Sequence, residues 1–370
     1  MKEKKKIRVA ILFGGKSAEH EVSLQSAKNV IDAIDKDKYD VVLIGIDKTG
    51  QWFLNDESRF LLHADNPSLI ALNKANDAVT LVPSEEGKQL VSLTRQSSPG
   101  RIDVVFPVLH GPFGEDGTVQ GLLKLADVPF VGASVLGSAV GMDKDVMKRL
   151  LRDADVPIPK FLVYDRQLIA FKEVRDYLGL PFFIKPANLG SSVGIHKIND
   201  EKTFTAAVAD AFLYDKKVIF EESIDGREIE CSVLGNEDPI ASVPGEIVPQ
   251  HEFYSYEAKY IDEKGAELIV PAQLPQDIVL RVQELAVQSF KVLCCEGMAR
   301  VDFFLRNDKE VIVNEINTIP GFTKISMYPR LWQESGISYI DLIDRLIELA
   351  IERHRKEKKL RTDFLGSDRY

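Results

Sequence analysis

The beginning of the chain alternates short apolar runs with helical patterns, and this feature most restricts how it can fold. IRVAILFGG, YDVVLIGID and IDVVFPVLHG are near-continuous in Val, Ile and Leu, and PFVG is a shorter run of the same kind. Between them, HEVSLQSAKNVIDAI and DGTVQGLLKLADV have helical spacing. Buried strands that alternate with helices predict an α/β domain, with a parallel sheet covered on both faces.

Three loops follow strands of this predicted sheet, where ligands of such sheets usually bind. They are FGGKSAEHE, LHGPFGEDG and VGAS. The first is not a P-loop, because the pattern needs a glycine where this chain has Ala10. It still predicts a tight turn into a helix whose first turn contains Glu21 and Ser23, and such a helix start favours anions. A capped helix explains this loop equally well.

The sequence pattern changes after about residue 138. A helix is predicted from 138 to 148, and then FLVYD, PFFIKPA, GIHKI, VIFEESI, REIECSVLG and PIASVPGEIV read as short strands with one clear helix at 201–211. This pattern indicates α+β structure with antiparallel strands. The last part predicts a helix at 277–293, a β-hairpin at 299–317 and a helix at 339–359.

Length and composition set the outer bounds. The chain has 370 residues, above the roughly 250–300 residues that one core supports, so two or three domains are expected. Its 45% hydrophobic content and net charge of -10 suit a globular protein and argue against nucleic acid as the main partner. Three cysteines without a C-x-x-C pair favour a cytoplasmic location. The apolar run at 7–13 is too short for a signal peptide, and no membrane insertion is expected.

The hairpin contains the most unusual pattern. Its strands, ARVDFFL and EVIVNEIN, are apolar except for Arg300 and Asp302 on one and Glu315 and Asn317 on the other. Each pair is two residues apart, so the hairpin places all four side chains on one face. Buried charge is costly without a partner. A salt-bridge cluster explains Arg300 and Asp302, but it does not explain the other two.

A magnesium site explains the whole set better. Asp302, Glu315 and Asn317 offer hard oxygen ligands, and Mg²⁺ uses few carboxylates and completes its shell with water and phosphate. Zinc fits less well because no His or Cys lies nearby in the sequence. Arg300 can neutralise a phosphoryl group or an oxyanion beside this cation. The sequence therefore favours a metal–nucleotide site.

Other segments fit the same site. KPANLGSSVGI is long for a hairpin turn, and its glycines and serines suit phosphate binding or a closing lid. VIFEESIDGREIE joins two strands and contains acids that could lie near the adenine and ribose of a nucleotide. Taken alone, this pattern is better explained by ordinary solvent-exposed acids. EFYSYEAKY contains aromatic and basic residues, which can bind nucleic acid. In this acidic chain, a loop that folds over a small substrate is the better interpretation.

Taken together, these motifs resemble the ATP-grasp superfamily and, within it, the D-alanine–D-alanine ligases. In order they are GG-x-S-x-E-x-E-V-S at 14–23, HG-x-x-GEDG at 110–117, MDK at 142–144, KP with GSSVG at 185–194, YEAKY at 256–260, R-x-D at 300–302 and NE-x-N-x-x-PG-x-T at 314–323. The resemblance implies a three-domain ATP-grasp architecture, α/β and α+β. Its expected parts are an N-terminal substrate-binding domain (1–137), a small central α+β domain (138–222) and a C-terminal α+β domain with the metal and catalytic residues (223–370).

The resemblance also implies an activity, which is the ATP-driven joining of two D-alanines for bacterial peptidoglycan. It implies ATP and two Mg²⁺ ions (Mn²⁺ as an alternative) as cofactors, and a homodimer. The carboxylate of the first D-alanine becomes an acyl phosphate, which the amine of the second then attacks. The protein mainly positions groups, stabilises charge and excludes water, because water would hydrolyse the acyl phosphate.

The resemblance implies roles for individual residues. Glu21 takes the ammonium of the first D-alanine, and Ser191 and Tyr260 form a hydrogen-bonded group with it that closes the site. Arg300 and the amide of Gly321 stabilise the tetrahedral oxyanion. The residues implied in substrate binding are His110, Lys259 and Ser326.

The nucleotide and metal sites are implied in the same way. Lys144 and Lys185 contact the phosphates of ATP, Glu221 lies near adenine and Glu228 near ribose. The implied cofactor-binding set is Lys144, Lys185, Ser192, Glu221, Glu222 and Glu228, and the implied metal ligands are Asp302, Glu315 and Asn317.

Two alternatives stay open. The first is a related carboxylate–amine or carboxylate–hydroxyl ligase that makes D-alanine–D-lactate or D-alanine–D-serine. The second is a non-catalytic nucleotide-binding regulator on the same scaffold, which would need neither Arg300 nor a complete set of metal ligands.

Overall fold

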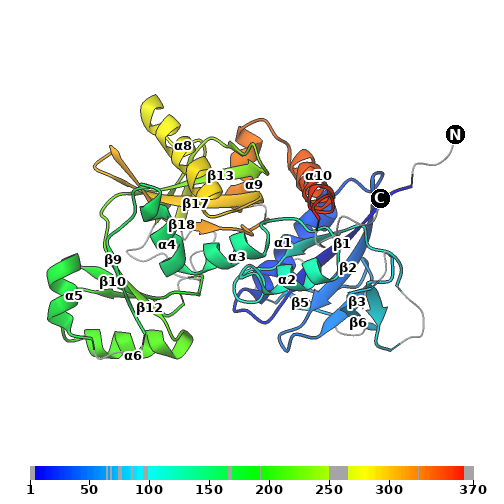
Figure 1. Cartoon of the computed structure of the whole chain (residues 1–370), viewed down its shortest axis with the longest axis horizontal. Helices are drawn as coiled ribbons and strands as arrows, with labels where there is room; N and C mark the ends of the chain where they lie inside the picture. Colours follow the sequence, from blue (N-terminus) through cyan, green and yellow to red (C-terminus); the bar gives the residue numbers. More distant parts are fainter. Residues whose placement is uncertain are drawn as a thin grey trace, which may run out of the picture.

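The chain forms three lobes, and each lobe is built on one of the three largest β-sheets (Figure 1). The computed structural model describes residues 5–63, 66, 69–73, 77–84, 87–94, 99–165, 169–191, 193–249, 266–323 and 325–361. The mixed α/β and α+β architecture predicted from the sequence is confirmed, with one sheet in each lobe. The predicted divisions at 1–137, 138–222 and 223–370 stay predictions.

The N-terminal lobe contains a six-stranded sheet in the order β7-β6-β3-β2-β1-β8. Only β1, β2 and β8 are parallel, so the expectation of a parallel sheet is correct for half of it. The next strand, β3, is antiparallel to β2, because the short turn at 47–51 cannot cross over the sheet. The elements of this lobe are β1 (Ile7–Gly14), α1 (His20–Ala33), β2 (Tyr39–Ile46), β3 (Trp52–Asn55), β4 (Leu61–Leu62), β5 (Ala71–Leu72), β6 (Asp77–Leu81), β7 (Leu90–Ser92), β8 (Val104–Val108) and α2 (Thr118–Leu125).

Two helices connect this lobe to the rest of the chain: α3 (Val135–Met142) and α4 (Lys144–Asp153). The sequence predicted one helix from 138 to 148, but Asp143 has an extended backbone and interrupts it. The carboxylate of Asp143 accepts hydrogen bonds from the backbone N–H groups of Asp145 and Val146, both at 3.1 Å. This N-cap starts a new helix at Lys144 and thereby fixes the position of that lysine.

The central lobe contains a four-stranded antiparallel sheet in the order β11-β10-β12-β9, as the short strands predicted. A cluster of buried rings that includes Phe182, Phe204 and Phe220 joins the sheet to its helices. The sequence predicted the second of the two helices and missed the first. The elements are β9 (Phe161–Tyr164), α5 (Phe171–Leu178), β10 (Phe182–Pro186), β11 (His196–Ile198), α6 (Phe204–Tyr214) and β12 (Val218–Glu222).

The C-terminal lobe is built on a sheet in the order β16-β15-β13-β17-β18, with β14 beside β13. The predicted hairpin is confirmed, and its turn residues Asn307 and Asp308 have positive φ of 52° and 54°, as a tight hairpin turn requires. The helix α9 was not predicted. The elements are β13 (Arg227–Gly235), β14 (Ile240–Ala241), β15 (Gly245–Pro249), β16 (Ala266–Ile269), α8 (Gln276–Val292), β17 (Gly297–Arg306), β18 (Glu310–Asn317), α9 (Met327–Glu334) and α10 (Tyr339–Glu357).

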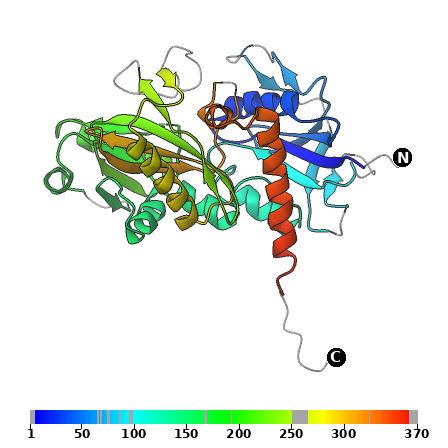
Figure 2. The same ribbon diagram turned by 90° about the horizontal axis from the view of Figure 1, so that it is seen from above.

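The last helix, α10, ties the first and third lobes together (Figure 2). It lies against β8 and α1 of the N-terminal lobe as well as β13 and β17 of the C-terminal lobe. Its buried Arg353 donates hydrogen bonds to the carbonyl oxygens of Phe130 and Gly132. The two lobes therefore share one hydrophobic core, which fixes the loops of the first sheet relative to the hairpin.

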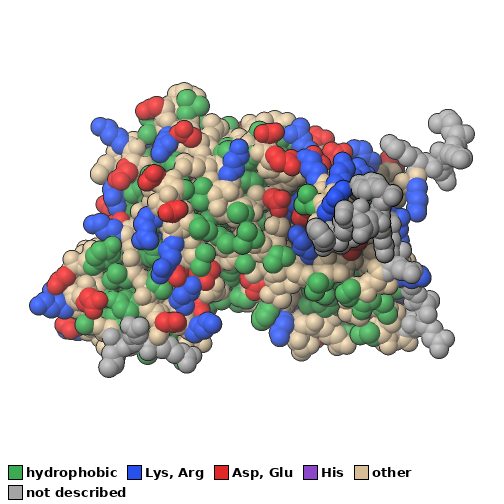
Figure 3. Space-filling model, in the orientation of Figure 1, with side chains coloured by type: hydrophobic (Ala, Val, Ile, Leu, Met, Phe, Trp, Pro, Cys, Tyr) green, Lys and Arg blue, Asp and Glu red, His purple; other side chains and the backbone are tan. Residues whose placement is uncertain are grey.

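The surface carries no broad basic face in the view of Figure 3, where Lys and Arg are interspersed with Asp and Glu. Within the described parts of the chain, no helix is long and apolar enough to cross a membrane.

Candidate active site

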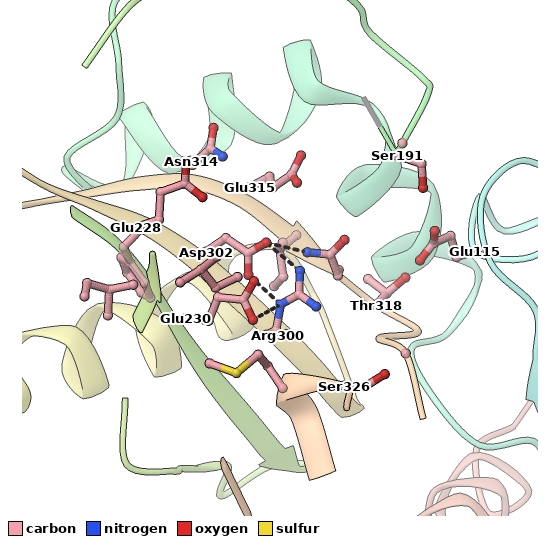
Figure 4. Close-up of a pocket in the computed structure, with 18 of the residues that line it drawn as sticks. Glu115, Ser191, Glu228, Glu230, Arg300, Asp302, Asn314, Glu315, Thr318 and Ser326 are labelled. Carbon is pink, nitrogen blue, oxygen red and sulfur yellow. Dashed lines mark hydrogen bonds and ion pairs between the residues drawn. The ribbon is translucent and has the colours of Figure 1, made fainter. Parts of the chain in front are cut away.

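A cavity of about 570 Å³ is lined by residues from all three lobes. Glu19 comes from the start of α1, Ser191 from the loop after β10, and Asp302 and Glu315 from the hairpin. In Figure 4 Ser191 lies at one side of the cavity, and Asp302 lies near its centre. Nine predicted site residues line it: Lys144, Ser191, Glu228, Arg300, Asp302, Glu315, Asn317, Gly321 and Ser326.

The hairpin face is arranged as its sequence predicted. Asp302 lies opposite Glu315, and Arg300 lies opposite Asn317. The guanidinium of Arg300 donates two hydrogen bonds to Asp302, from Nε to Oδ1 and from Nη2 to Oδ2, both at 2.7 Å. Such a two-point contact fixes the orientation of both groups.

The donor set of this face fits a magnesium ion. Asn317 donates its Nδ2 to Oδ2 of Asp302 at 3.0 Å, and its amide oxygen is then the atom that can act as a ligand. Two carboxylates and one amide oxygen suit Mg²⁺ when phosphate oxygens supply further ligands. Among the described residues, no group of three or more His, Cys, Asp or Glu side chains converges as a metal site. The protein thus provides part of a coordination shell rather than a complete one.

The carboxylate that meets Ser191 belongs to Glu19 and not to Glu21. The hydroxyl of Ser191 donates to Oε1 of Glu19, which is buried and lines the cavity. Glu21 instead pairs with Lys48 at 2.6 Å, outside the cavity. The predicted contact between Ser191 and Glu21 is therefore wrong. Both acids were within the motif, but Glu19 is the N-cap residue of α1 and Glu21 lies on the helix itself.

The loop at 187–195 holds Ser191 in an uncommon conformation. Ser191 has a φ of 53°, which is rare for residues other than glycine and often marks a functional position. Asp215 anchors the loop by accepting a hydrogen bond at 2.7 Å from the backbone of Asn188. At the other side, Lys144 donates to the carbonyl oxygen of Leu189 at 2.9 Å.

Lys144 also joins this loop to the hairpin, because its Nζ lies 3.4 Å from Oε2 of Glu315. It is mostly buried, with 11% of its side chain exposed. The N-cap at Asp143 and these two contacts place a cation directly beside the candidate metal ligands, where the phosphates of a nucleotide would need it.

Glu221 forms a buried ionic cluster with two lysines and does not line the cavity. Its Oε1 lies 2.7 Å from Nζ of Lys185, and its Oε2 lies 2.6 Å from Nζ of Lys148. Burial acts to raise the pKa of Glu221, but the two ammonium groups lower it to about 2. Burial lowers the pKa of Lys148, whereas Glu221 outweighs burial and raises the pKa of Lys185. Lys148, one helical turn after Lys144, was not predicted.

Glu222 is the last residue of β12 in the central lobe, whereas Glu228 lies on β13 in the C-terminal lobe. Glu228 lines the cavity as predicted. Glu222 accepts a hydrogen bond at 2.8 Å from the backbone of Lys160 and lies 3.5 Å from Arg306. It is not among the cavity-lining residues, so its side chain ties strands together and the predicted contact with the nucleotide finds no support.

His110 lies behind the cavity wall instead of lining it. Its Nδ1 donates to the carbonyl oxygen of Ile319 at 3.0 Å, and its Nε2 lies 3.3 Å from the hydroxyl of Ser26, which also accepts from the backbone of Phe322 at 3.3 Å. Burial lowers the pKa of His110, so the ring is neutral near pH 7. His110 therefore holds the segment that contains Gly321.

Gly321 approaches Ser326 too closely to carry a side chain. A Cβ at Gly321 would lie 2.8 Å from the hydroxyl oxygen of Ser326. Ser326 begins α9, and its hydroxyl accepts a hydrogen bond at 3.0 Å from the backbone of Thr323. Both residues line the cavity, so this turn places Gly321 and the hydroxyl group of Ser326 at the cavity wall.

Besides Glu19, two further cavity-lining acids were missed. Glu115 lies in the predicted GEDG loop, where Gly111 donates its backbone N–H to Oε1 at 2.8 Å. Burial, and secondarily the carboxylate of Glu19, raise the pKa of Glu115 to about 8. Glu230 follows Glu228 by two residues on β13 and lies 2.9 Å from Nε of Arg300. Strand alternation places Glu230 on the same face as Glu228, and this signal was present in the sequence.

Three predicted site residues, Ser192, Lys259 and Tyr260, lie outside the described residues. The segment EFYSYEAKY, predicted as a lid, also lies outside them.

Comparisons with known proteins agree across almost the whole chain. Residues 8–133 match the family described as D-ala D-ala ligase N-terminus, and residues 150–348 match D-ala D-ala ligase C-terminus. A D-alanine–D-alanine ligase from Shouchella clausii is 60% identical over 360 residues, covering 96% of this chain and 98% of the relative. D-alanine–D-alanine ligase A from Escherichia coli K12 is 55% identical over 360 residues, covering 96% and 99%.

Solved structures give the same result. The D-alanine–D-alanine ligase from Coxiella burnetii superposes with a TM-score of 0.84 at 39% identity, covering 96% of this chain and 97% of the other. A D-Ala:D-Ser ligase from Enterococcus faecalis superposes with a TM-score of 0.82 at 37% identity, covering 94% of this chain and all of the other (100%). With both halves matched and relatives of more than half identity over nearly the full length, this chain belongs to the D-alanine–D-alanine ligase family.

Proposed function

We propose that this protein joins two D-alanine molecules into D-alanyl-D-alanine, with ATP converted to ADP and phosphate. One observation carries the proposal: Glu19, Ser191, Arg300 and Asp302, which come from three lobes, line a single cavity. An acid for an ammonium group, a hydroxyl, a guanidinium and part of a metal site are what an acyl-phosphate ligation needs. A regulator that only binds nucleotide would have no use for the Glu19–Ser191 contact.

The reaction has two steps. A carboxylate oxygen of the first D-alanine attacks the γ-phosphorus of ATP, ADP leaves, and an acyl phosphate forms. The amine of the second D-alanine, after loss of a proton, attacks the acyl carbon. Phosphate then leaves with the bonding electrons, and the peptide bond remains. Both steps build up negative charge, so fixed cations and amide groups lower their barriers.

We assign roles to the chain's own residues on this basis. Glu19 replaces Glu21 as the acceptor of the first ammonium group, and the Ser191 hydroxyl closes that end of the site. Arg300 and the amide of Gly321 stabilise the tetrahedral oxyanion. The residues that hold phosphates in this proposal are Lys144 and Lys185, and Ser326 is the candidate for the second carboxylate.

The nucleotide requires a divalent cation in this proposal. Asp302, Glu315 and Asn317 would hold two Mg²⁺ ions, or Mn²⁺ in their place, between the hairpin and the phosphates. Bound there, the ions neutralise the charge of the phosphoryl group. The proposed metal site is supported by the oxygen donors that these residues offer on the paired strands β17 and β18.

We further propose a cytoplasmic homodimer. The location is supported by the three free cysteines, Cys231, Cys294 and Cys295, which suit a reducing compartment. The dimer rests on resemblance to the family, and light scattering of the purified protein tests it.

The function is tested by product analysis. The protein is supplied with ATP, Mg²⁺ and D-alanine, with D-serine or D-lactate offered as a competing second substrate, and both phosphate release and the joined products are measured. The D-Ala:D-Ser ligase of similar fold makes D-serine the necessary competitor. The proposal expects D-alanyl-D-alanine as the dominant product. A dominant D-alanyl-D-serine product would assign the chain to the alternative, and ATP-independent or absent product would refute ligation.

A further inference from the structure

Arg300 lies between two carboxylates that come from different strands. Glu230 on β13 faces Asp302 on β17 in the sheet register, and Arg300 contacts both (Figure 4). The Nε atom of Arg300 lies 2.9 Å from Oε2 of Glu230 and 2.7 Å from Oδ1 of Asp302. Glu230 is largely buried, with 7% of its side chain exposed. Arg300 therefore contacts two buried acids beside the cavity.

Asp302 has little bonding capacity left in this arrangement. Its Oδ2 accepts from Nη2 of Arg300 and from Nδ2 of Asn317, and its Oδ1 accepts from Nε of Arg300. A carboxylate has about four lone-pair sites, two on each oxygen. Oδ2 thus accepts two of these hydrogen bonds, and Oδ1 accepts the third from the guanidinium of Arg300. A cation at Asp302 would meet the positive charge of Arg300 at close range.

Glu230 offers Arg300 a second place to bond. Its Oε2 already lies within ion-pair distance of Nε, on the strand that pairs with β17. If Nε moves its hydrogen bond from Asp302 to Glu230, Oδ1 of Asp302 is released toward a cation. Arg300 then stays anchored while its other nitrogens can face the reacting oxygen.

We propose that Glu230 is a positioning residue that retains Arg300 while Asp302 turns to the magnesium ion. This inference rests on the proposed metal-binding role of Asp302. It predicts that the charge of Glu230 helps magnesium to bind, although Glu230 itself touches no metal ion.

A second pair in the same sheet provides a matched control. Glu246 on β15 is nearly as buried as Glu230, with 10% of its side chain exposed against 7%, and Arg227 bonds to it at 2.7 and 2.8 Å. Neither residue of this pair lines the cavity. Glu246→Gln therefore removes a buried carboxylate from an arginine pair at a distance from the proposed metal ligands.

The experiment compares Glu230→Gln with Glu246→Gln in the full-length protein. Magnesium is titrated into protein saturated with ADP, and binding is followed by calorimetry, so the readout does not depend on turnover. Residues that orient metal ligands typically change metal affinity by about 10- to 100-fold. We expect Glu230→Gln to need at least about tenfold more magnesium for half-saturation, with a lower kcat and little change in the KM for ATP at saturating magnesium. Glu246→Gln should titrate like wild type.

Two further variants separate the possible outcomes. Asp302→Asn should abolish magnesium binding to the ADP-saturated protein, and if it does not, the metal assignment fails rather than the role of Glu230. Glu230→Asp keeps the charge and should recover most of the magnesium affinity, and Glu230→Ala replaces Glu230→Gln as the uncharged variant if the latter does not fold. The inference is overturned if Glu230→Gln titrates like wild type, if Glu246→Gln shifts the titration equally, or if Glu230→Asp is as impaired as Glu230→Gln.

Discussion

The hydroxyl of Ser191 donates a hydrogen bond to the carboxylate of Glu19, 172 positions away in the chain and in a different lobe. The contact closes one end of the cavity and fixes which acid of the SAEHE segment faces the substrate. It also links the loop after β10 to the start of α1. Any change in how the lobes meet would alter this contact first.

The contact predicts different effects for two neighbouring acids. Glu19→Gln removes a charged acceptor for the substrate ammonium, and hydrogen bonds to charged groups contribute about 1.5–3 kcal/mol. We expect kcat/KM for D-alanine to fall roughly ten- to hundredfold. Glu21→Gln removes an exposed ion pair with Lys48 and should leave kcat/KM for D-alanine near the wild-type value. Steady-state kinetics at saturating ATP make the comparison, and equal losses in both variants would contradict the assignment.

A second prediction concerns the stability of the fold as a function of pH. Burial and the nearby Glu19 raise the pKa of Glu115 from 4.5 to about 8. Between these values the folded protein binds a proton that the unfolded chain has lost, so this group makes stability fall as pH rises. Glu115→Gln should remove that contribution. In thermal melts from pH 5 to 8, the melting temperature of this variant should fall less with rising pH than that of the wild type. If the two melting temperatures fall in parallel, Glu115 is already ionised in the folded state.

The buried ionic cluster around Glu221 gives a third prediction. Lys148→Met takes away one of the two ammonium groups that pair with Glu221 and leaves the other, Lys185, in place. Breaking a buried pair typically costs about 3–5 kcal/mol. We expect a clear drop in melting temperature and a higher KM for ATP, because Lys185, already 2.7 Å from Glu221, is then the only one of these two lysines left to offset its charge. Lys148→Met and Glu221→Gln each remove the Lys148–Glu221 pair, so the double variant should lose less stability than the sum of the two single losses. A double variant whose loss equals the sum of the two single losses would show that the pair is not coupled.

Glu315 provides a direct test of the magnesium face. Glu315→Gln keeps the shape of the side chain and removes one charged ligand, so turnover should collapse while the melting temperature changes little. The measurement is phosphate release over a range of magnesium concentrations. Near wild-type activity at limiting magnesium would mean that Glu315 does not hold the cation, and the contact of Lys144 with Glu315 would then be structural.

Much of the site could be predicted from the sequence because it lies on strands. Side chains alternate along a strand, so Arg300 and Asp302 share one face of β17, and Glu315 and Asn317 share one face of β18. The turn at Asn307 and Asp308 sets the register only as far as Phe303 and Val313. An irregularity between Asp302 and Phe303, which the sequence did not predict, shifts the register so that Asp302 lies opposite Glu315 and Arg300 opposite Asn317. The N-terminal strands were equally clear, but the sequence carried no sign that β3, β6 and β7 would extend the parallel sheet in antiparallel fashion.

The sequence by itself determined the parallel strands of the first lobe, the polar residues of the hairpin and the family. The tertiary structure decided which acids work together. Glu19 and Glu21 lie at the start of a helix, where residues two apart point about 200° apart, and the way α1 packs on the sheet selects one of them. Likewise, Glu230 meets Arg300 because β13 pairs with β17, 70 positions later in the chain. Such contacts depend on how separate segments pack together, which no local pattern encodes.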